Sequence, residues 1–318
     1  METRKRTVTL EELRLREVTL NSTLAKMGHD MRVRAVEVRK NNIFKSGFRI
    51  SVPGAHLQMT FYPTPEDMTA PDLKLLTDMV ERYNEGLIEM SKEDTDIDRD
   101  SLIAHLMPRV MSEDNADWLR EAGRPCKAVL DMVMTLQLSW EVNGLLRKGE
   151  IASLQVTDEL LERNNLTADE AFAIAMRNAE RDAEITPMRQ VIEELLGREL
   201  PEEENAPKMF IASNNQRTNG APVMFCKKVQ SELLEIFGRE SVYILPSSVH
   251  EVIAISASYL QIDELKQMVY EINRSTVDPE DRLTDEVYTL TGTPEAPVLG
   301  MHTSLGVPGQ TTFLVAHC

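Results

Sequence analysis

The chain has 318 residues, of which 42% are hydrophobic and 27% are charged. This balance is typical of a globular protein and argues against a disordered chain. No run of about eighteen apolar residues occurs, and the acidic Glu11 and Glu12 follow the basic start, so neither a membrane-spanning helix nor a signal peptide is predicted. We therefore expect a cytoplasmic protein, long enough for one large domain or two ordinary ones.

Three cysteines, Cys126, Cys226 and Cys318, are too few and too scattered for a disulfide framework. None belongs to a CxxC pair, so a zinc site is not expected, and Cys126 and Cys226 are predicted to be buried thiols.

Charge is distributed unevenly along the chain. The formal net charge is −17, yet residues 1–50 hold 12 Lys or Arg against 6 Asp or Glu. A basic first segment could steer an acidic partner to one end of an acidic body, or it could be a solvated face within the fold.

The first half of the chain predicts a mixed architecture. Residues 9–27 have helical periodicity, and the alternation in residues 31–40, with the apolar runs at 48–52 and 57–62, predicts a three-stranded antiparallel meander. Helices are expected from Thr64 onward and near 115–123, 157–165 and 167–182, the last with a capping box of Thr167 and Glu170. Further strands are expected in 101–111, 128–140 and 151–156.

The acidic segment 199–207 has almost nothing to bury, so a subdomain boundary is predicted there, after an N-terminal subdomain of residues 1–198. Residues 208–290 then predict a ββαββα order, with APVMF (221–225) as its second strand. The whole predicts an α+β fold of two antiparallel-sheet subdomains, each backed by helices. Residues 291–318, rich in Gly, Pro and Thr, are expected to be a disordered tail.

One polar group of residues lies between two apolar runs, in the stretch ILPSSVHEVIAI (244–255). Ser248, His250 and Glu251 could form a hydrolase or transferase site, with Ser247 or Ser248 as nucleophile and Asp285 or Glu286 as the orienting acid. The zinc-protease pattern fails because Ala254 stands where a second histidine is needed. An ordinary turn is the alternative, because Pro-Ser-Ser is common turn chemistry.

A second polar loop, SNNQRTNG (213–220), carries amides around Arg217. It is either a solvated hairpin end or a site that hydrogen-bonds a peptide or an anion. If both loops come from adjacent hairpins, they could form one binding patch. The residues predicted for that patch are Asn215, Arg217, Asn219, Ser247, Ser248, His250 and Glu251.

Cofactor binding is not predicted, because neither GxxxxGK[ST] nor a GxGxxG after a strand occurs. No histidine pair has metal-ligand spacing, so no metal is expected either. Arg32, Arg34 and Arg39 could contact nucleic-acid phosphates from an alternating strand, although an exposed strand blunted by charge is the simpler interpretation.

Several stretches, including MFIASNNQRTNGAPVMF, YILPSSVHEVIAI and DELKQMVYEINRSTV, resemble a bacterial family catalogued as domain of unknown function 5688. The resemblance covers roughly residues 31–290 and implies intracellular proteins of gut-dwelling Firmicutes, sometimes carried near mobile elements, without an assigned activity. It supplies no catalytic residue. We therefore expect a non-enzymatic binding or accessory factor with a protein or peptide partner, and keep the hydrolase and nucleic-acid readings as alternatives.

Overall fold

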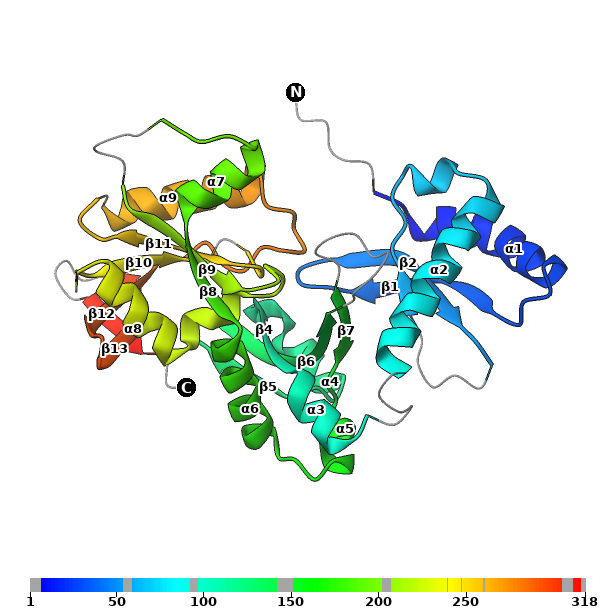
Figure 1. The fold of residues 1–318 in the computed structure, drawn as a ribbon, viewed down its shortest axis with the longest axis horizontal. Coiled ribbons are helices and arrows are strands. Elements are labelled where there is room, and N and C mark those ends of the chain that lie inside the picture. Colours follow the sequence, from blue (N-terminus) through cyan, green and yellow to red (C-terminus); the bar gives the residue numbers. More distant parts are fainter. Residues whose placement is uncertain are drawn as a thin grey trace. The chain divides into compact units, whose positions relative to one another are not determined.

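The computed structural model describes residues 7–53, 59–91, 97–141, 151–201, 207–238, 240–246, 248–259, 261–304 and 311–315. The predicted α+β class is confirmed, because helices accompany three antiparallel sheets in this part of the chain (Figure 1). The chain forms two compact units. Unit 1 comprises Met1–Ile97 and Trp140–Ala152, and unit 2 comprises Asp98–Ser139 and Ser153–Cys318.

Unit 1 packs two helices on one face of an antiparallel sheet with the order β1-β2-β3. Its described elements are α1 (Leu10–Lys26), β1 (Arg32–Arg39), β2 (Phe44–Ser51), β3 (Met59–Phe61), the 3₁₀ turn η1 (Asp67–Thr69) and α2 (Asp72–Ser91). This arrangement confirms the predicted meander.

Helix α1 begins at a capping box, in which Thr9 and Glu12 each satisfy a backbone donor of the first turn. Its buried leucines, Leu13, Leu20 and Leu24, share a core with Phe48 and Ile50 of β2 and with apolar residues of α2. The apolar stripe of each helix therefore fixes which face of the sheet is covered.

Unit 2 contains a smaller and a larger sheet. Its described elements in chain order are α3 (Arg99–His105), β4 (Leu106–Ser112), η2 (Glu113–Asn115), α4 (Ala116–Glu121), β5 (Cys126–Val129), β6 (Met132–Glu141), β7 (Ile151–Gln155), α5 (Asp158–Arg163), α6 (Ala168–Arg181), β8 (Ala183–Pro187), α7 (Met188–Leu196), β9 (Met209–Asn214), η3 (Ala221–Phe225), α8 (Lys227–Ile236), β10 (Val242–Leu245), β11 (Val252–Ser256), α9 (Ile262–Ser275), β12 (Tyr288–Thr293), β13 (Ala296–Ser304) and β14 (Thr311–Val315). The last two residues of β6 and the first two of β7 are assigned to unit 1.

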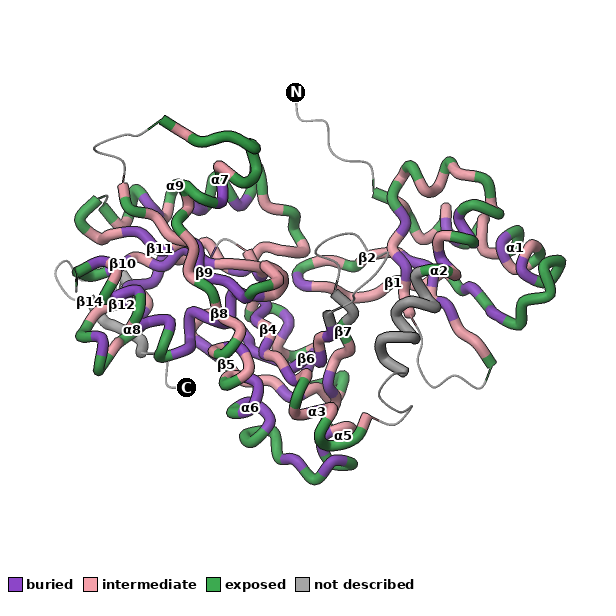
Figure 2. The backbone as a smooth tube through the Cα atoms, in the orientation of Figure 1, coloured by how far each residue is buried: buried purple, intermediate pink, exposed green. Residues whose placement is uncertain are grey.

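The larger sheet has the order β14-β13-β12-β10-β11-β9-β8 among the described residues. Helix α9 packs through Leu265 and Val269 on the face that carries Leu245 and Ile255, and α8 lies on the opposite face (Figure 1). Figure 2 shows burial concentrated along the central strands of this sheet. The smaller sheet has the order β4-β6-β5, with β7 also paired to β6.

The division of the chain differs from the predicted boundary at 199–207. Strand β8 lies before that segment and β9 after it, yet the two pair directly, with Ile185 opposite Ala212. The acidic segment therefore connects elements of one sheet rather than two subdomains, and its residues 202–206 lie outside the described residues. The short run AEITP was missed as a strand because a brief edge strand ending in proline has little periodicity.

Two further predictions need correction. APVMF is the 3₁₀ turn η3, with a proline in its first turn, so the order after residue 208 is not ββαββα. Residues 291–304, predicted to be part of a disordered tail, complete β12 and β13, where Leu290 pairs with Leu299 and both side chains are buried. The burial of Leu290 and Leu299 stabilises this hairpin despite its Gly- and Pro-rich composition. Residues 305–310 and 316–318 lie outside the described residues.

Candidate functional site

Two loops of unit 2 meet at the ends of two neighbouring strands of the larger sheet, β9 and β11. Residues 215–220 follow β9, and residues 248–251 precede β11. The two strands are antiparallel neighbours, with Ala212 opposite Val252, so the end of β9 lies beside the start of β11. We call residues 215–220 and 248–251 the paired-loop surface. Ser247, a predicted binding residue, lies outside the described residues.

Gly220 allows the two loops to touch. Its N–H donates to the carbonyl of His250 at 3.0 Å, and Ser213 Oγ donates to the same carbonyl at 2.7 Å. A Cβ atom at position 220 would lie 2.7 Å from that carbonyl oxygen and 2.6 Å from the Asn214 nitrogen. Real Cβ atoms do not approach backbone this closely, so the position requires glycine for space.

The His250 ring joins the two loops to a third segment. Its Nδ1 accepts a hydrogen bond from the Asn219 N–H at 3.2 Å, and its Nε2 lies 3.2 Å from Asp281 Oδ1. Because Nδ1 is an acceptor, the geometry assigns the proton to Nε2, which donates it to Asp281. Asp281 is held in turn, since its carbonyl accepts from the Val249 N–H at 2.8 Å.

Ser248 and His250 do not form a nucleophile–base pair. The Ser248 hydroxyl oxygen accepts from the backbone N–H of His250 at 3.1 Å, a local turn bond, while both ring nitrogens have other partners. A serine nucleophile needs its hydroxyl on a ring nitrogen of the base. The hydrolase alternative therefore lacks its central contact.

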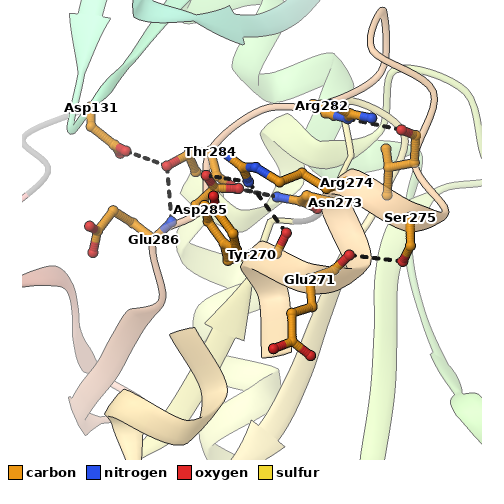
Figure 3. Close-up of polar contacts among 11 residues, drawn as sticks. Asp131, Tyr270, Glu271, Asn273, Arg274, Ser275, Arg282, Thr284, Asp285 and Glu286 are labelled. Atoms are coloured by element: carbon orange, nitrogen blue, oxygen red, sulfur yellow. Dashed lines mark hydrogen bonds and ion pairs between the residues drawn. The ribbon is translucent and has the colours of Figure 1, made fainter. Parts of the chain in front are cut away.

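The acids proposed for that alternative are engaged elsewhere. Asp285 accepts from Asn273 Nδ2 and Arg274 Nη1, both at 2.9 Å (Figure 3), and Glu286 Oε2 lies 2.6 Å from Lys266 Nζ. The carboxylate beside His250 is Asp281, which sequence reasoning missed because the DPED turn lies thirty-one residues away.

Asn214 shapes the first loop. Its side chain donates to the Thr218 carbonyl at 2.9 Å and accepts from the Thr218 N–H at 3.1 Å. Arg217 and Asn219 adopt left-handed backbone conformations, with φ of 49° and 51°. Such conformations cost free energy in non-glycine residues and persist where the surrounding contacts enforce them.

Polar side chains of the paired-loop surface are exposed to solvent to different degrees. Asn215 is exposed, Glu251 is half-buried, and the Arg217 side chain keeps 38% of its surface exposed while it lies 3.5 Å from Glu194 of α7. An exposed ion pair of this length contributes little to stability, so Arg217 can exchange Glu194 for another partner.

A partly buried polar cluster that the sequence did not indicate lies around Asp131. Asp131, in the β5–β6 turn, accepts from Thr284 Oγ1 at 2.5 Å (Figure 3) and also from the Tyr288 hydroxyl. Burial raises the pKa of Tyr288 well above its ordinary value, and the Asp131 charge raises it further. The adjacent Leu130 has a φ of 55°, which is unusual for a leucine.

Residues 276–287 thus connect two places in unit 2. Asp281 contacts the paired-loop surface, and Thr284 contacts the smaller sheet through Asp131. Asn273, near the end of α9, anchors the segment by also donating to the Thr284 carbonyl at 2.9 Å (Figure 3). Within the segment, Arg282 Nε donates to the Val277 carbonyl at 2.9 Å.

Within the described ranges, no group of three or more His, Cys, Asp or Glu side chains is placed to hold a metal ion. In the same ranges, no helix combines the length and apolarity needed to cross a bilayer.

These features define an α+β protein of two compact units. In unit 2, two polar loops are joined to each other by hydrogen bonds. Residues 16–291 match the model of a family described as a family of unknown function, DUF5688, so the chain belongs to this family. The resemblance seen in the sequence is thereby confirmed. Searches of curated proteins and of solved structures found no match.

Proposed function

We propose that this protein is a cytoplasmic, non-enzymatic binding protein, and that the paired-loop surface contacts a protein or peptide partner. The observation that carries the proposal is the His250 ring, which joins both loops and Asp281 while taking no part in a serine–base pair. Free Cys126 and Cys226 are consistent with a reducing compartment.

Pre-organisation supports binding at this surface. The hydrogen bonds of Asn214, Gly220 and His250 order the loops before any partner arrives. A partner therefore does not need to supply the free energy of ordering them, which otherwise reduces affinity. Asn215 and Arg217 then offer an amide and a guanidinium, groups that pair with peptide carbonyls and carboxylates.

The proposed role is that of an accessory or regulatory factor, and the link to a mobile element that the family resemblance implies belongs to this same proposal. The proposal predicts that a partner protein co-purifies with the chain, and that its capture depends on the paired-loop surface rather than on general surface charge.

The test is affinity capture of the full chain from lysate of a bacterium that encodes a family member, with mass spectrometry of the eluate. The variant Asn215→Ala/Arg217→Ala is compared with Gln267→Ala/Lys227→Ala, which likewise removes one amide and one positive charge, from exposed positions on α9 and α8. We expect a partner protein that the second variant captures and the first variant does not. Equal retention by both variants would refute the assignment to the paired-loop surface.

A further inference from the structure

The outward face of the unit 1 sheet has a charge pattern that the paired-loop proposal does not use. Val33 pairs with Ile50, and both side chains are buried against the helices. Neighbouring residues in a strand point to opposite faces, so the pairs on either side face away from the helices. The outward positions are Arg32, Arg34, Val36, Val38, Lys45, Gly47, Arg49, Ser51, Thr60 and Tyr62. We call these ten residues the basic sheet face.

This face carries four cations and no carboxylate, in a chain whose net charge is −17. Arg34 lies directly opposite Arg49, and no carboxylate among the described residues forms an ion pair with either. Like charges directly opposite each other on a sheet destabilise it. A polyanion laid across the face would turn that repulsion into attraction.

Tyr62 holds two lysines at the basic sheet face. A Cβ at Gly47 would lie 2.9 Å from Tyr62 Cδ1, so the ring rests on the backbone of β2. Lys40 Nζ lies 4.4 Å from the ring centroid and Lys45 Nζ lies 5.3 Å from it, both within cation–π range. The ring therefore gathers positive charge on this face rather than offering a free surface for stacking bases.

The sheet edge at β1 is closed to an added peptide strand near its start. Asn21 of α1 accepts from the Val33 N–H at 3.0 Å and donates to the Val33 carbonyl at 2.7 Å, and Glu17 accepts from the Ala35 N–H at 2.8 Å. Backbone groups that would pair with an extended peptide are already satisfied there. Recognition at this strand must therefore use side chains of the face.

We propose that the basic sheet face binds the sugar–phosphate backbone of a nucleic acid. Arginine pairs with phosphate oxygens through two parallel hydrogen bonds, and the hydroxyls of Ser51 and Thr60 are further phosphate donors. The acidic remainder of the chain repels the same ligand and so restricts it to this face. Single- and double-stranded RNA and DNA share this backbone, and the experiment distinguishes them.

The experiment measures fluorescence anisotropy of labelled single- and double-stranded RNA and DNA oligonucleotides with the full chain, between about 50 and 200 mM salt. The variant Arg34→Gln/Arg49→Gln is compared with Arg14→Gln/Lys26→Gln, which removes the same charge from exposed positions on α1. Thermal unfolding by circular dichroism establishes that both variants are folded.

The wild-type chain is expected to bind at least one of the four nucleic acids, and affinity should fall with added salt. The face variant should weaken binding about tenfold or more and reduce the slope of log K against log salt by about 1.4 to 1.8. The control should change affinity by less than about threefold, in line with a distant charge. The nucleic acid bound most tightly identifies the ligand class.

Three outcomes would overturn the proposal. These are no binding of any oligonucleotide at the lowest salt, equal loss in both variants, and displacement of the nucleic acid by polyglutamate at matched charge concentration. The last result would mean that an acidic protein is the partner.

Discussion

The carboxylate of Asp281 lies 3.2 Å from Nε2 of His250, and the opposite ring nitrogen accepts the Asn219 N–H. A side chain with partners at both nitrogens holds three chain segments in one arrangement. The ring is therefore a structural link between the loops, and the polar groups around it remain for recognition.

Replacing His250 should destabilise unit 2. In His250→Ala the Asn219 N–H and the Asp281 carboxylate lose their partner, and we expect a loss of about 1 to 2 kcal/mol in the free energy of unfolding, measured by urea titration. Asp281→Asn is the matched control, because an amide oxygen still accepts from Nε2–H. If that variant loses as much stability, the ring is charged and the assigned tautomer is wrong.

Gly220→Ala should cost more than Gly197→Ala. Gly220 has an ordinary φ of −86° but no room for a Cβ, whereas Gly197 has a φ of 63° with nothing within 4 Å. Overpacking against backbone is expected to cost about 2 kcal/mol or more, and the left-handed position about 1 kcal/mol. Chemical denaturation of both variants tests this order, and equal losses would show that the two loops can move apart enough to admit a Cβ at position 220.

Tyr288 should make stability sensitive to alkaline pH. The pKa of its hydroxyl is raised in the fold, so its contribution is fully present below the ordinary tyrosine pKa and is lost as the pH rises toward the folded value. Tyr288→Phe should cost about 1 to 3 kcal/mol at neutral pH, because Asp131 loses a donor.

The measurement is urea unfolding of wild type and Tyr288→Phe from pH 8 to pH 11, with Tyr259→Phe as a surface control. The stability difference between wild type and Tyr288→Phe should shrink above a pH of about 10, where tyrosine ionises in the unfolded chain. A difference that stays constant over this range would contradict the burial of a protonated hydroxyl.

Arg49→Glu should stabilise unit 1 while abolishing the nucleic-acid binding proposed for its basic sheet face. The substitution places a carboxylate opposite Arg34, and cross-strand pairs of opposite charge contribute about 0.2 to 1 kcal/mol. Thermal unfolding at low salt should show a modest rise in Tm that disappears at high salt. A fall in Tm would mean that Arg49 supports the fold in a way the strand pairing does not reveal.

Patterns among residues close together in the sequence predicted many of the helices and strands. The helical periodicity of residues 9–27, the capping box at Thr167 and the alternation from Arg32 to Arg39 predicted helices and a strand that the structure contains. These features depend on residues a few positions apart. Strands β8 and β13 were not predicted, because β8 pairs with a strand that follows the acidic segment and β13 lies in a Gly- and Pro-rich stretch.

The sequence predicted which loops form the candidate site, but not the side chains from other elements that hold them. Turn chemistry drew attention to Ser248, His250 and the Asn219-Gly220 pair, and the structure brings these loops together. Asp281 and Asp131 could not be found in this way, because their partners are contributed by separate elements of the tertiary fold. Likewise, strand register separates Arg39 from Arg32 and Arg34 and adds Arg49 to their face.

The most direct test of the central claim is the protonation of His250, read from long-range ¹H–¹⁵N correlation spectra of the imidazole at neutral pH. A structural link between the loops predicts a neutral ring with the proton on Nε2 and a bare Nδ1, together with slow exchange of the Asn219 amide. A ring protonated on Nδ1, or a rapidly exchanging Asn219 amide, would contradict the bond between the loops and with it the pre-organised binding surface.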